Sequence, residues 1–311
     1  MPKDTLRTKP RAMNYALPFC RGEIVGVYDA EDKPDPGQIR AVVQHLMDAP
    51  PEVACVQGYL DFYNTADNWL ARCFTIEYAI WFRVLLTGVQ RLGLPIPLGG
   101  TTVFFRRRAL EEIGAWDAHN VTEDADLGMR LARFGYRCEM IASTTWEEAN
   151  CHGVLRWVGQ RSRWLKGYAI TWASHMRNPA RLWRDLGWRG FLGFQVLFLG
   201  GLTSYLALPL FWLLWTAAAG LDLPVFANVP TPLLVALFAS TVLGQAVMLV
   251  AAAVALADSG RKRMLPWVLT LPAYWPLGAL AAYRAIAEVF YAPFHWTKTE
   301  HGLHLGGEDA R

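Results

Sequence analysis

Three carboxylates stand close together after a short apolar run. The segment "GEIVGVYDAED" predicts a buried strand at Ile24–Tyr28 that is followed by Asp29, Glu31 and Asp32. In open α/β sheets, ligands bind beyond the carboxyl ends of the strands. Oxygen ligands spaced in this way suit Mg²⁺ or Mn²⁺ that is also bound to phosphates. Taken alone, the stretch slightly favours a simple acidic turn before the helix predicted in "PGQIRAVVQHLM", so both interpretations stay open.

A second acidic group occurs in "VTEDADLGMRLARFGY", where Glu123 and Asp124 follow Thr122. Thr122 is a typical N-cap, the acids suit the positive end of a helix, and Gly135 predicts the helix end. Capping alone would account for these residues. A carboxylate at a helix start beside a cleft is, however, also what a general base requires.

Basic residues and tryptophans are interleaved in "GVLRWVGQRSRWLKGYAITW", residues 153–172. On a helix with 3.6 residues per turn, one face becomes apolar and rich in tryptophan, and the other carries Arg156, Arg163 and Lys166. Only Arg161 falls on the apolar face, where we expect its long side chain to snorkel. Such a helix is typical of a segment that lies in a membrane interface.

The elements that must position these residues follow an α/β pattern. After the first strand and its helix, a second strand is predicted at "VACVQGYL" and a long helical stretch at residues 67–92. The pair Gly99-Gly100 then predicts a turn before the strand "TTVFF", and a helix at residues 107–112 ends before Gly114. The first half of the chain is therefore predicted to be an α/β domain.

The second half has a different composition. Charged residues are frequent up to Trp188 and then become scarce until Asp258. Two uncharged runs, at about residues 191–219 and 232–257, are long enough to span a membrane. A third apolar run at about residues 265–282 is interrupted by prolines, so it either crosses the membrane or dips in and returns.

Loop charges predict how these spans are oriented. The loop between the two runs carries Asp222 and no Lys or Arg, whereas the loop after them contains Arg261, Lys262 and Arg263. The positive-inside rule therefore places the first loop outside and residues 1–188 in the cytoplasm. We expect a multi-pass protein of the plasma (inner) membrane with a cytoplasmic catalytic domain.

Cysteine usage and net charge fit this location. The five cysteines show no CxxC pair, which favours reduced thiols in a cytosolic domain over a disulfide framework. The net charge of +3 is too small to indicate a nucleic-acid partner. The partners we expect are a nucleotide-sugar donor, a glycan or lipid acceptor and the lipid bilayer.

The order of these motifs resembles that of the membrane-bound family 2 glycosyltransferases, the group that contains cellulose and hyaluronan synthases. Five motifs occur in order between an α/β pattern and apolar helices, and a sixth segment resembles the gating segment of such enzymes. The matching segments are "TKPRAMNYAL" (Thr8–Leu17), "YDAED" (Tyr28–Asp32), "LGGTTVFFRR" (Leu98–Arg107), "TED" (Thr122–Asp124), "QRSRW" (Gln160–Trp164, the QxxRW pattern) and "HWTKTEHG" (His295–Gly302).

The resemblance implies a GT-A type (Rossmann-like) α/β fold that requires Mg²⁺ or Mn²⁺. Where the family has Asp-x-Asp, this chain has Asp-Ala-Glu-Asp, so Glu31 or Asp32 replaces the second acid, and we expect Glu31. Asp29 and Glu31 would then hold the metal, and Asp124 would be the catalytic base. The other residues implied are Lys9, Asp29, Gln160 and Arg163 for the nucleotide-sugar and its diphosphate, and Glu123 and Trp164 for the acceptor.

The resemblance also predicts the organisation of the chain. We expect a partial GT-A domain at residues 1–152, lacking the first strand and its "VPxYNE"-like motif, and interfacial helices at 153–188. A transmembrane region at 189–292 and a gating-like tail at 293–311 would follow.

The predicted function is inverting transfer of a sugar, UDP-glucose being the suggested donor, to a polysaccharide or lipid acceptor. Two alternatives stay open. One is a single-sugar glycolipid synthase of the ceramide-glucosyltransferase type, and the other is a non-catalytic membrane remnant or partner subunit.

Overall fold

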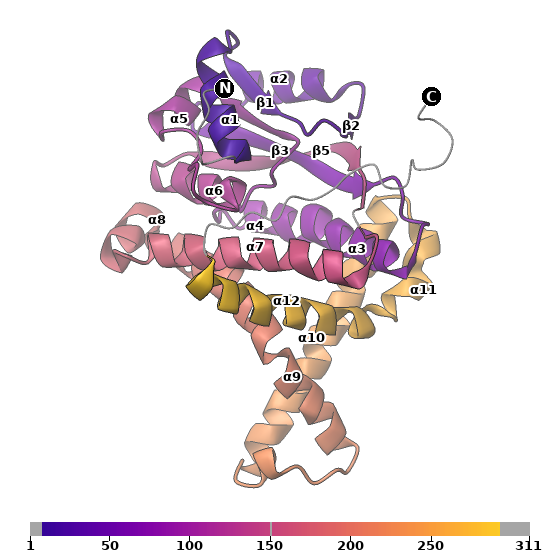
Figure 1. Cartoon of the computed structure of the whole chain (residues 1–311). Helices are drawn as coiled ribbons and strands as arrows, with labels where there is room; N and C mark the ends of the chain where they lie inside the picture. The colour runs from indigo at the N-terminus through magenta and orange to yellow at the C-terminus, as the bar shows by residue number, and fades with distance from the viewer. Residues whose placement is uncertain (1–7, 150, 293–311) are drawn as a thin grey trace.

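The computed structural model describes residues 8–149 and 151–292 and shows a mixed sheet above a layer of helices, from which a helical hairpin projects (Figure 1). The predicted gating-like tail, residues 293–311, lies outside the described residues. The strands are β1 (Ile24–Val27), β2 (Lys33–Pro34), β3 (Val53–Phe62), β4 (Val103–Arg106) and β5 (Arg137–Glu147).

The sheet is ordered β1-β4-β3-β5-β2, with β3 at its centre. β3 pairs antiparallel with β4 and parallel with β5, while β1 and β2 pair antiparallel with β4 and β5. Every residue of β3 is buried because the strand is covered on both faces, and its sequence accordingly lacks a simple two-residue alternation. β4 and β5 therefore flank β3, and β1 and β2 form the two edges of the sheet.

Helices cover both faces of the sheet. One face packs against α2 through Val42 and Leu46, and the other packs against a larger core that includes Leu86 and Leu110. The helices are α1 (Lys9–Ala16), α2 (Gln38–Asp48), α3 (Trp69–Ala79), the π-helical stretch η2 (Ile80–Leu86), α4 (Thr87–Arg91), α5 (Arg107–Glu112), α6 (Glu123–Arg133), α7 (Val154–His175), α8 (Pro179–Phe194), the π-helical stretch η3 (Gln195–Gly200), α9 (Gly201–Ala218), α10 (Thr231–Asp258), α11 (Leu265–Val268) and α12 (Leu271–Tyr291); single 3₁₀ turns lie at Leu17–Phe19, Pro224–Phe226 and Lys262–Met264.

Most predicted elements of the α/β domain are present at nearly the predicted bounds. The long helical stretch begins at Trp69, where the side chain of Asn68 accepts a hydrogen bond from the amide of Ala71 at 2.8 Å. The helix α5 has the predicted bounds. Gly114, two residues after its end, has a φ of +81°, which turns the chain away from the helix. Two strands were absent from the prediction: β2, of two residues, and β5, although "RCEM" at the start of β5 alternates polar and apolar residues.

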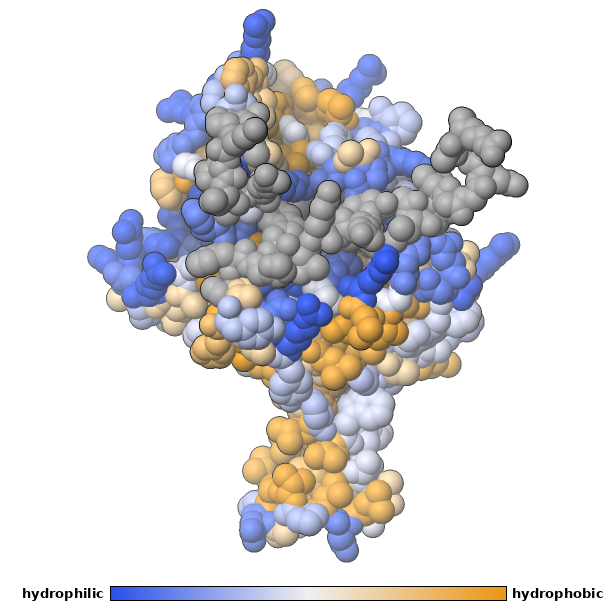
Figure 2. All heavy atoms as spheres, in the orientation of Figure 1, coloured by the Kyte–Doolittle hydropathy of each residue, from blue (hydrophilic) through white to orange (hydrophobic). Residues whose placement is uncertain are grey.

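Two helical segments are long and apolar enough to cross a membrane, judged by length and composition: Pro179–Ala218 and Thr231–Asp258. They include both predicted spans. The first segment bends at Gly187, which adopts a φ of +66°. The paired α9 and α10 form the hairpin that projects from the helical layer, and Figure 2 shows hydrophobic side chains gathered over it. This surface indicates association with a membrane.

The third apolar run forms α11 and α12, and α12 lies along α7 (Figure 1). This packing corrects the prediction that α7 exposes a basic face. Lys166 is only 1% exposed, and its Nζ lies 3.1 Å from a carboxylate oxygen of Glu288 on α12. Thr171 on the same face is also buried. The prediction was wrong because amphipathic periodicity cannot tell a polar face that meets water from one that meets a buried acid.

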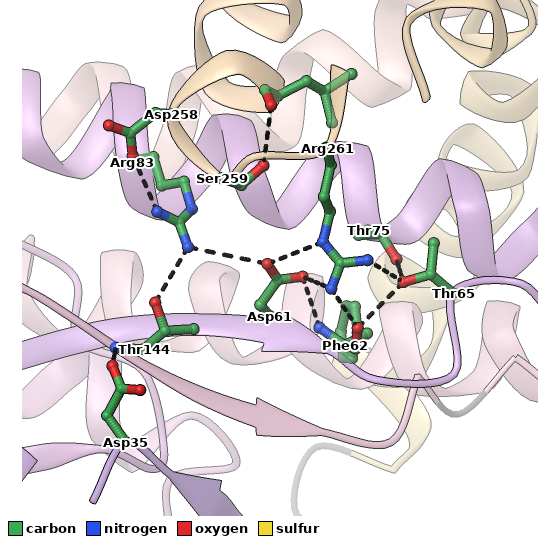
Figure 3. A network of polar contacts seen from close by, with 11 residues as sticks. Asp35, Asp61, Phe62, Thr65, Thr75, Arg83, Thr144, Asp258, Ser259 and Arg261 are labelled. Carbon is green, nitrogen blue, oxygen red and sulfur yellow. Dashed lines mark hydrogen bonds and ion pairs between the residues drawn. The ribbon is translucent and has the colours of Figure 1, made fainter. Parts of the chain in front are cut away.

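A polar network joins the sheet to the loop after α10 (Figure 3). Arg261 makes two contacts with the carboxylate of Asp61 on β3, at 3.0 and 3.2 Å, and donates to the carbonyl of Phe62 at 2.7 Å. Arg83 of η2 pairs with Asp258 at 2.9 Å and donates to Thr144 of β5 at 3.1 Å. The positively charged loop after α10 is therefore held against the sheet.

We expect Arg261→Met to lower the free energy of unfolding by about 3 kcal/mol, because Asp61 is then left buried without its two-point partner. Denaturant unfolding in detergent micelles, followed by circular dichroism, measures this change. The control is Lys262→Met, an exposed residue of the same loop, for which we expect a change within about 0.5 kcal/mol. Equal losses in both variants would contradict the role of the network.

Candidate active site

A single cavity of about 630 Å³ lies between the ends of the strands and the helical layer. Its walls combine segments from most of the chain, from α1 to α12. All eight residues that the sequence predicted for the site line this cavity: Lys9, Asp29, Glu31, Glu123, Asp124, Gln160, Arg163 and Trp164.

The first acids lie in the turn directly after β1. Lys9 of α1 forms an ion pair with Asp29 and donates a hydrogen bond to the carbonyl of Gly100 at 2.8 Å. Asp32 does not line the cavity, because its Oδ2 accepts hydrogen bonds from the amide of Asp29, at 2.8 Å, and from the hydroxyl of Thr101. Asp32 thus holds the turn in shape, while Asp29 and Glu31 face the cavity.

The residues present fit a hard divalent cation. Asp29 and Glu31 supply two carboxylates, and Mg²⁺ is typically held by one or two carboxylates together with substrate phosphates and water. Among residues 8–149 and 151–292, no group of three or more His, Cys, Asp or Glu could hold a metal alone. The phosphates of a ligand would therefore have to complete the coordination.

Two further acids at the end of β5 line the same part of the cavity, Glu147 and Glu148. Burial raises the pKa of Glu147 well above its usual value, and the neighbouring carboxylates of Asp32, Asp29 and Glu31 raise it further. Glu147 therefore keeps its proton more readily than an exposed glutamate would, which limits the negative charge at the strand ends. Sequence reasoning missed both acids because it missed β5, although the adjacent acids "EE" after "STTW" were a visible signal.

The TED motif forms the start of α6. Thr122 stands at the predicted N-cap position, but its side chain makes no capping hydrogen bond; its hydroxyl instead lies 3.5 Å from the side-chain oxygen of Asn120. The prediction of capping by Thr122 was therefore wrong. A different side chain hydrogen-bonds to the backbone at the helix start: the carboxylate of Asp124 accepts a hydrogen bond from the amide of Ala125 at 2.8 Å.

The two adjacent acids differ in exposure. Glu123 is 5% exposed, and burial, together with the charge of Asp124, raises its pKa to about 8. Asp124 is less enclosed; burial raises its pKa, while the amide of Ala125 and the cations Lys9 and Arg163 oppose the rise. At neutral pH the pair therefore combines a largely protonated Glu123 with an Asp124 that is held beside cations.

Gly100 allows Lys9 and Asp124 to come close to the same point. A Cβ atom at Gly100 would lie 3.0 Å from Oδ2 of Asp124 and 3.8 Å from Nζ of Lys9. The absence of a side chain at this position keeps the space between the base candidate and the acidic turn open.

Close helix packing places α6 against α7. A Cβ atom at Gly167 would lie 2.3 Å from the side chain of Thr122, so only glycine fits there without a shift. Nε2 of His175 on α7 also lies 2.9 Å from Oδ1 of Asp126 on α6. These contacts fix TED relative to the QxxRW segment.

The QxxRW residues on α7 face the acids across the cavity. Burial lowers the pKa of Arg163, and the carboxylates of Glu123, Asp124 and Asp29 oppose this change. Arg163 therefore lies in the field of acids from both the TED motif and the turn after β1. Trp164 packs against Phe74, with ring centroids 6.0 Å apart, and leaves part of its ring on the cavity.

Arg161 does not snorkel, contrary to the prediction. Its side chain is 11% exposed, and Nη2 lies 2.5 Å from a carboxylate oxygen of Glu77 on α3. The guanidinium also lies over the rings of Trp157 and Trp164, at 5.1 and 4.9 Å from their centroids. A largely enclosed acid on another helix thus replaces the water that snorkelling would have provided, and sequence periodicity carried no signal for Glu77.

Comparison with known proteins gives matches over most of the chain. Residues 24–284 match the family described as "Glycosyl transferase family group 2". The chain is 29% identical over 168 residues to "Probable glycosyltransferase YdaM" of Bacillus subtilis, an alignment that covers 53% of this chain and 39% of that protein. It is 29% identical over 176 residues to "Beta-monoglucosyldiacylglycerol synthase" of Trichormus variabilis, covering 55% of this chain and 36% of that protein.

A solved structure is also similar. The mannosyltransferase PcManGT from Pyrobaculum calidifontis, in complex with GDP-Man and Mn²⁺, gives a TM-score of 0.46 at 21% identity and covers 90% of this chain and 67% of that chain.

The comparisons and the fold agree on the class of protein. The alignments span less than two-fifths of the length of the two curated relatives. The predicted fold class, a GT-A type α/β domain followed by an α-helical region, is confirmed by the mixed sheet and the family match. Because that match extends over residues 24–284, the chain belongs to glycosyl transferase family group 2.

Proposed function

We propose that this protein transfers a sugar from a nucleotide-sugar donor, with inversion, to a glycan or lipid acceptor at a membrane. The observation that carries the proposal is that one cavity brings together two metal-type carboxylates, a base candidate beside cations and an aromatic platform. These are the parts that transfer from an activated diphosphate requires.

The donor would occupy the end of the cavity at β1. Asp29 and Glu31 would hold Mg²⁺ or Mn²⁺, which neutralises charge on the diphosphate leaving group when bound. Lys9 and Arg163 bring positive charge to the same region, and Gln160 adds a hydrogen-bonding amide. UDP-glucose is the donor that we propose to test first.

Asp124 would act as the base. It accepts the proton of the acceptor hydroxyl as that oxygen forms a bond to the anomeric carbon. The bond from this carbon to the diphosphate oxygen breaks on the opposite side, and the diphosphate leaves with the electron pair. One displacement of this kind inverts the configuration. Protonated Glu123 would donate a hydrogen bond to the acceptor, and Trp164 would support a sugar ring.

The membrane arrangement completes the proposal. The two helices Pro179–Ala218 and Thr231–Asp258 would cross the plasma (inner) membrane, with the catalytic domain in the cytoplasm. The contact of Arg261 with Asp61 supports this orientation, because it keeps the positive loop on the same side as the sheet.

We expect Asp124→Asn to fold and bind donor while transfer falls about a hundredfold to ten-thousandfold, the usual contribution of a positioned base. The side chain keeps its shape and can still accept from Ala125, but it no longer takes up a proton. Single-turnover transfer of radiolabelled sugar, measured in vesicles, tests this. Asp117→Asn, at an exposed residue just before the motif, is the control that should match the parent. A rate for Asp124→Asn above about a tenth of the parental rate would place the base elsewhere.

We expect transfer to require Mg²⁺ or Mn²⁺ and to stop in excess EDTA. Asp29→Ala should lose binding of Mn²⁺, followed by electron paramagnetic resonance in the presence of UDP, because one of two protein carboxylates is removed. Asp48→Ala, an exposed acid on α2, should bind Mn²⁺ as the parent does. Undiminished turnover in EDTA would remove the metal from the mechanism.

We expect the stability of the protein to fall as pH rises between about 4.5 and 8, with Glu123 as a contributor. The carboxyl binds a proton in the folded state up to pH 8, whereas in the unfolded state it releases the proton near its usual pKa, so a rise in pH favours unfolding. Glu123→Gln should reduce this slope in melting temperatures measured from pH 5 to 8. Glu111→Gln, an exposed acid, should leave the slope unchanged. An unaltered slope in Glu123→Gln would show that Glu123 is ionised in the folded protein.

A further inference from the structure

The cavity does not end at the reacting groups but continues into the helical layer. Beyond Trp164 its lining passes to the two apolar helical segments and to α12. The residues of this part, which we call the tail pocket, are Leu197, Gly201, Tyr205, Met248 and Trp275.

The tail pocket differs chemically from the acidic end. Leu197, Gly201 and Met248 offer no side-chain hydrogen-bonding group, and the polar atoms of the pocket are confined to the hydroxyl of Tyr205 and the indole N–H of Trp275. The hydroxyl of Tyr205 lies 3.5 Å from a carboxylate oxygen of Glu77. Glu77 also pairs with Arg161 and accepts a hydrogen bond from the hydroxyl of Tyr274 at 2.5 Å. A sugar chain carries hydroxyls on every ring that need partners, whereas a hydrocarbon chain needs none.

The position of the tail pocket is also informative. Leu197, Gly201 and Tyr205 belong to the apolar segment Pro179–Ala218, and Met248 to the apolar segment Thr231–Asp258. Gly201 begins α9, and Tyr205 and Met248 pack against a core that includes Trp157 of α7 and Tyr274 of α12. The hairpin of α9 and α10 projects from the helical layer and carries many exposed large hydrophobic side chains, including Trp212 and Val247 (Figures 1 and 2). A chain held by the tail pocket would therefore come from the level of the bilayer.

Two walls of the tail pocket, α9 and α12, are closely packed against each other. A Cβ atom at Gly278 of α12 would lie 2.3 Å from the ring of Tyr205, so α9 and α12 meet as closely as glycine permits. The ring of Tyr205 lies 6.4 Å from that of Trp275, measured between centroids. At Gly201, in contrast, a Cβ atom would meet no other atom within 4 Å, so a side chain there would have room inside the pocket.

From this arrangement we propose that the tail pocket binds the hydrocarbon chain of a lipid acceptor and so presents its hydroxyl to Asp124. The role of the hydroxyl as sugar acceptor rests on the proposed function. The binding of the hydrocarbon chain in the tail pocket does not depend on that function. Leu197, Gly201 and Met248 would thereby select acceptors that carry an apolar chain, and soluble glycans would bind poorly.

The experiment uses the full chain in lipid vesicles that contain a diacylglycerol with a diazirine at the end of one acyl chain. Irradiation should crosslink the parent within residues 197–205 and near Met248, as mapped by mass spectrometry. Gly201→Trp and the smaller Gly201→Leu should lose these crosslinks, because both fill the pocket. Gly244→Trp is the matched control, since Gly244 is an exposed glycine of α10 that also has open space around its Cβ position but does not line the cavity.

A second measurement separates this proposal from the proposed function. Slow hydrolysis of UDP-glucose, with water as acceptor, needs the donor site but not the tail pocket, so we expect Gly201→Leu to keep it while losing transfer to diacylglycerol. Crosslinks spread over the outside of α9 and α10 and unaffected by Gly201→Trp would overturn the tail pocket. Loss of parental crosslinks on addition of a soluble cello-oligosaccharide would overturn it in favour of a glycan site. If neither the parent nor any variant hydrolyses UDP-glucose while the crosslinks appear as expected, the choice of UDP-glucose as donor is refuted and the tail pocket is not.

Discussion

Ion pairs between largely enclosed side chains determine how the two halves of this molecule fit together. Arg261, in the loop after α10, meets Asp61 of the central strand, and Arg161 of α7 meets Glu77 of α3. Loss of the cation would leave an acid such as Asp61 buried without its partner, which costs several kcal/mol, so each pair holds its two segments in place. The apolar hairpin, α7 and the sheet are consequently held in one register. The cavity exists because this register leaves space between them.

The helix α7 shows how this constraint serves a site. Gln160, Arg163 and Trp164 face the cavity, while Lys166 points to Glu288 on α12. A helix with charged groups on two sides is stable here because each buried charge has a partner on a different neighbour. The close approach at Gly167 then brings the start of α6 against this helix. The base candidate and the cations that surround it thus depend on the same packing.

These features explain what the sequence could and could not predict. Strands and helices with a clear period, such as β1, α2 and α5, were predicted because their pattern reflects one buried face. That eight distant residues share one cavity followed from the resemblance to a family, since no local pattern encodes a contact between α1 and α7. Glu77, the partner of Arg161, was not predictable for the same reason. Hydropathy identified α7 as amphipathic but could not say that α12 would cover it.

The acidic end and the apolar end belong to one cavity. Burial is the main cause of the raised pKa values of Glu123 and Asp124, and Leu197 and Met248 line the same cavity. A base with a raised pKa accepts a proton more readily from a hydroxyl. An acyl chain in the tail pocket would exclude further water and would strengthen this effect only when an acceptor is present. The donor would then be protected from hydrolysis by the same walls that select the acceptor.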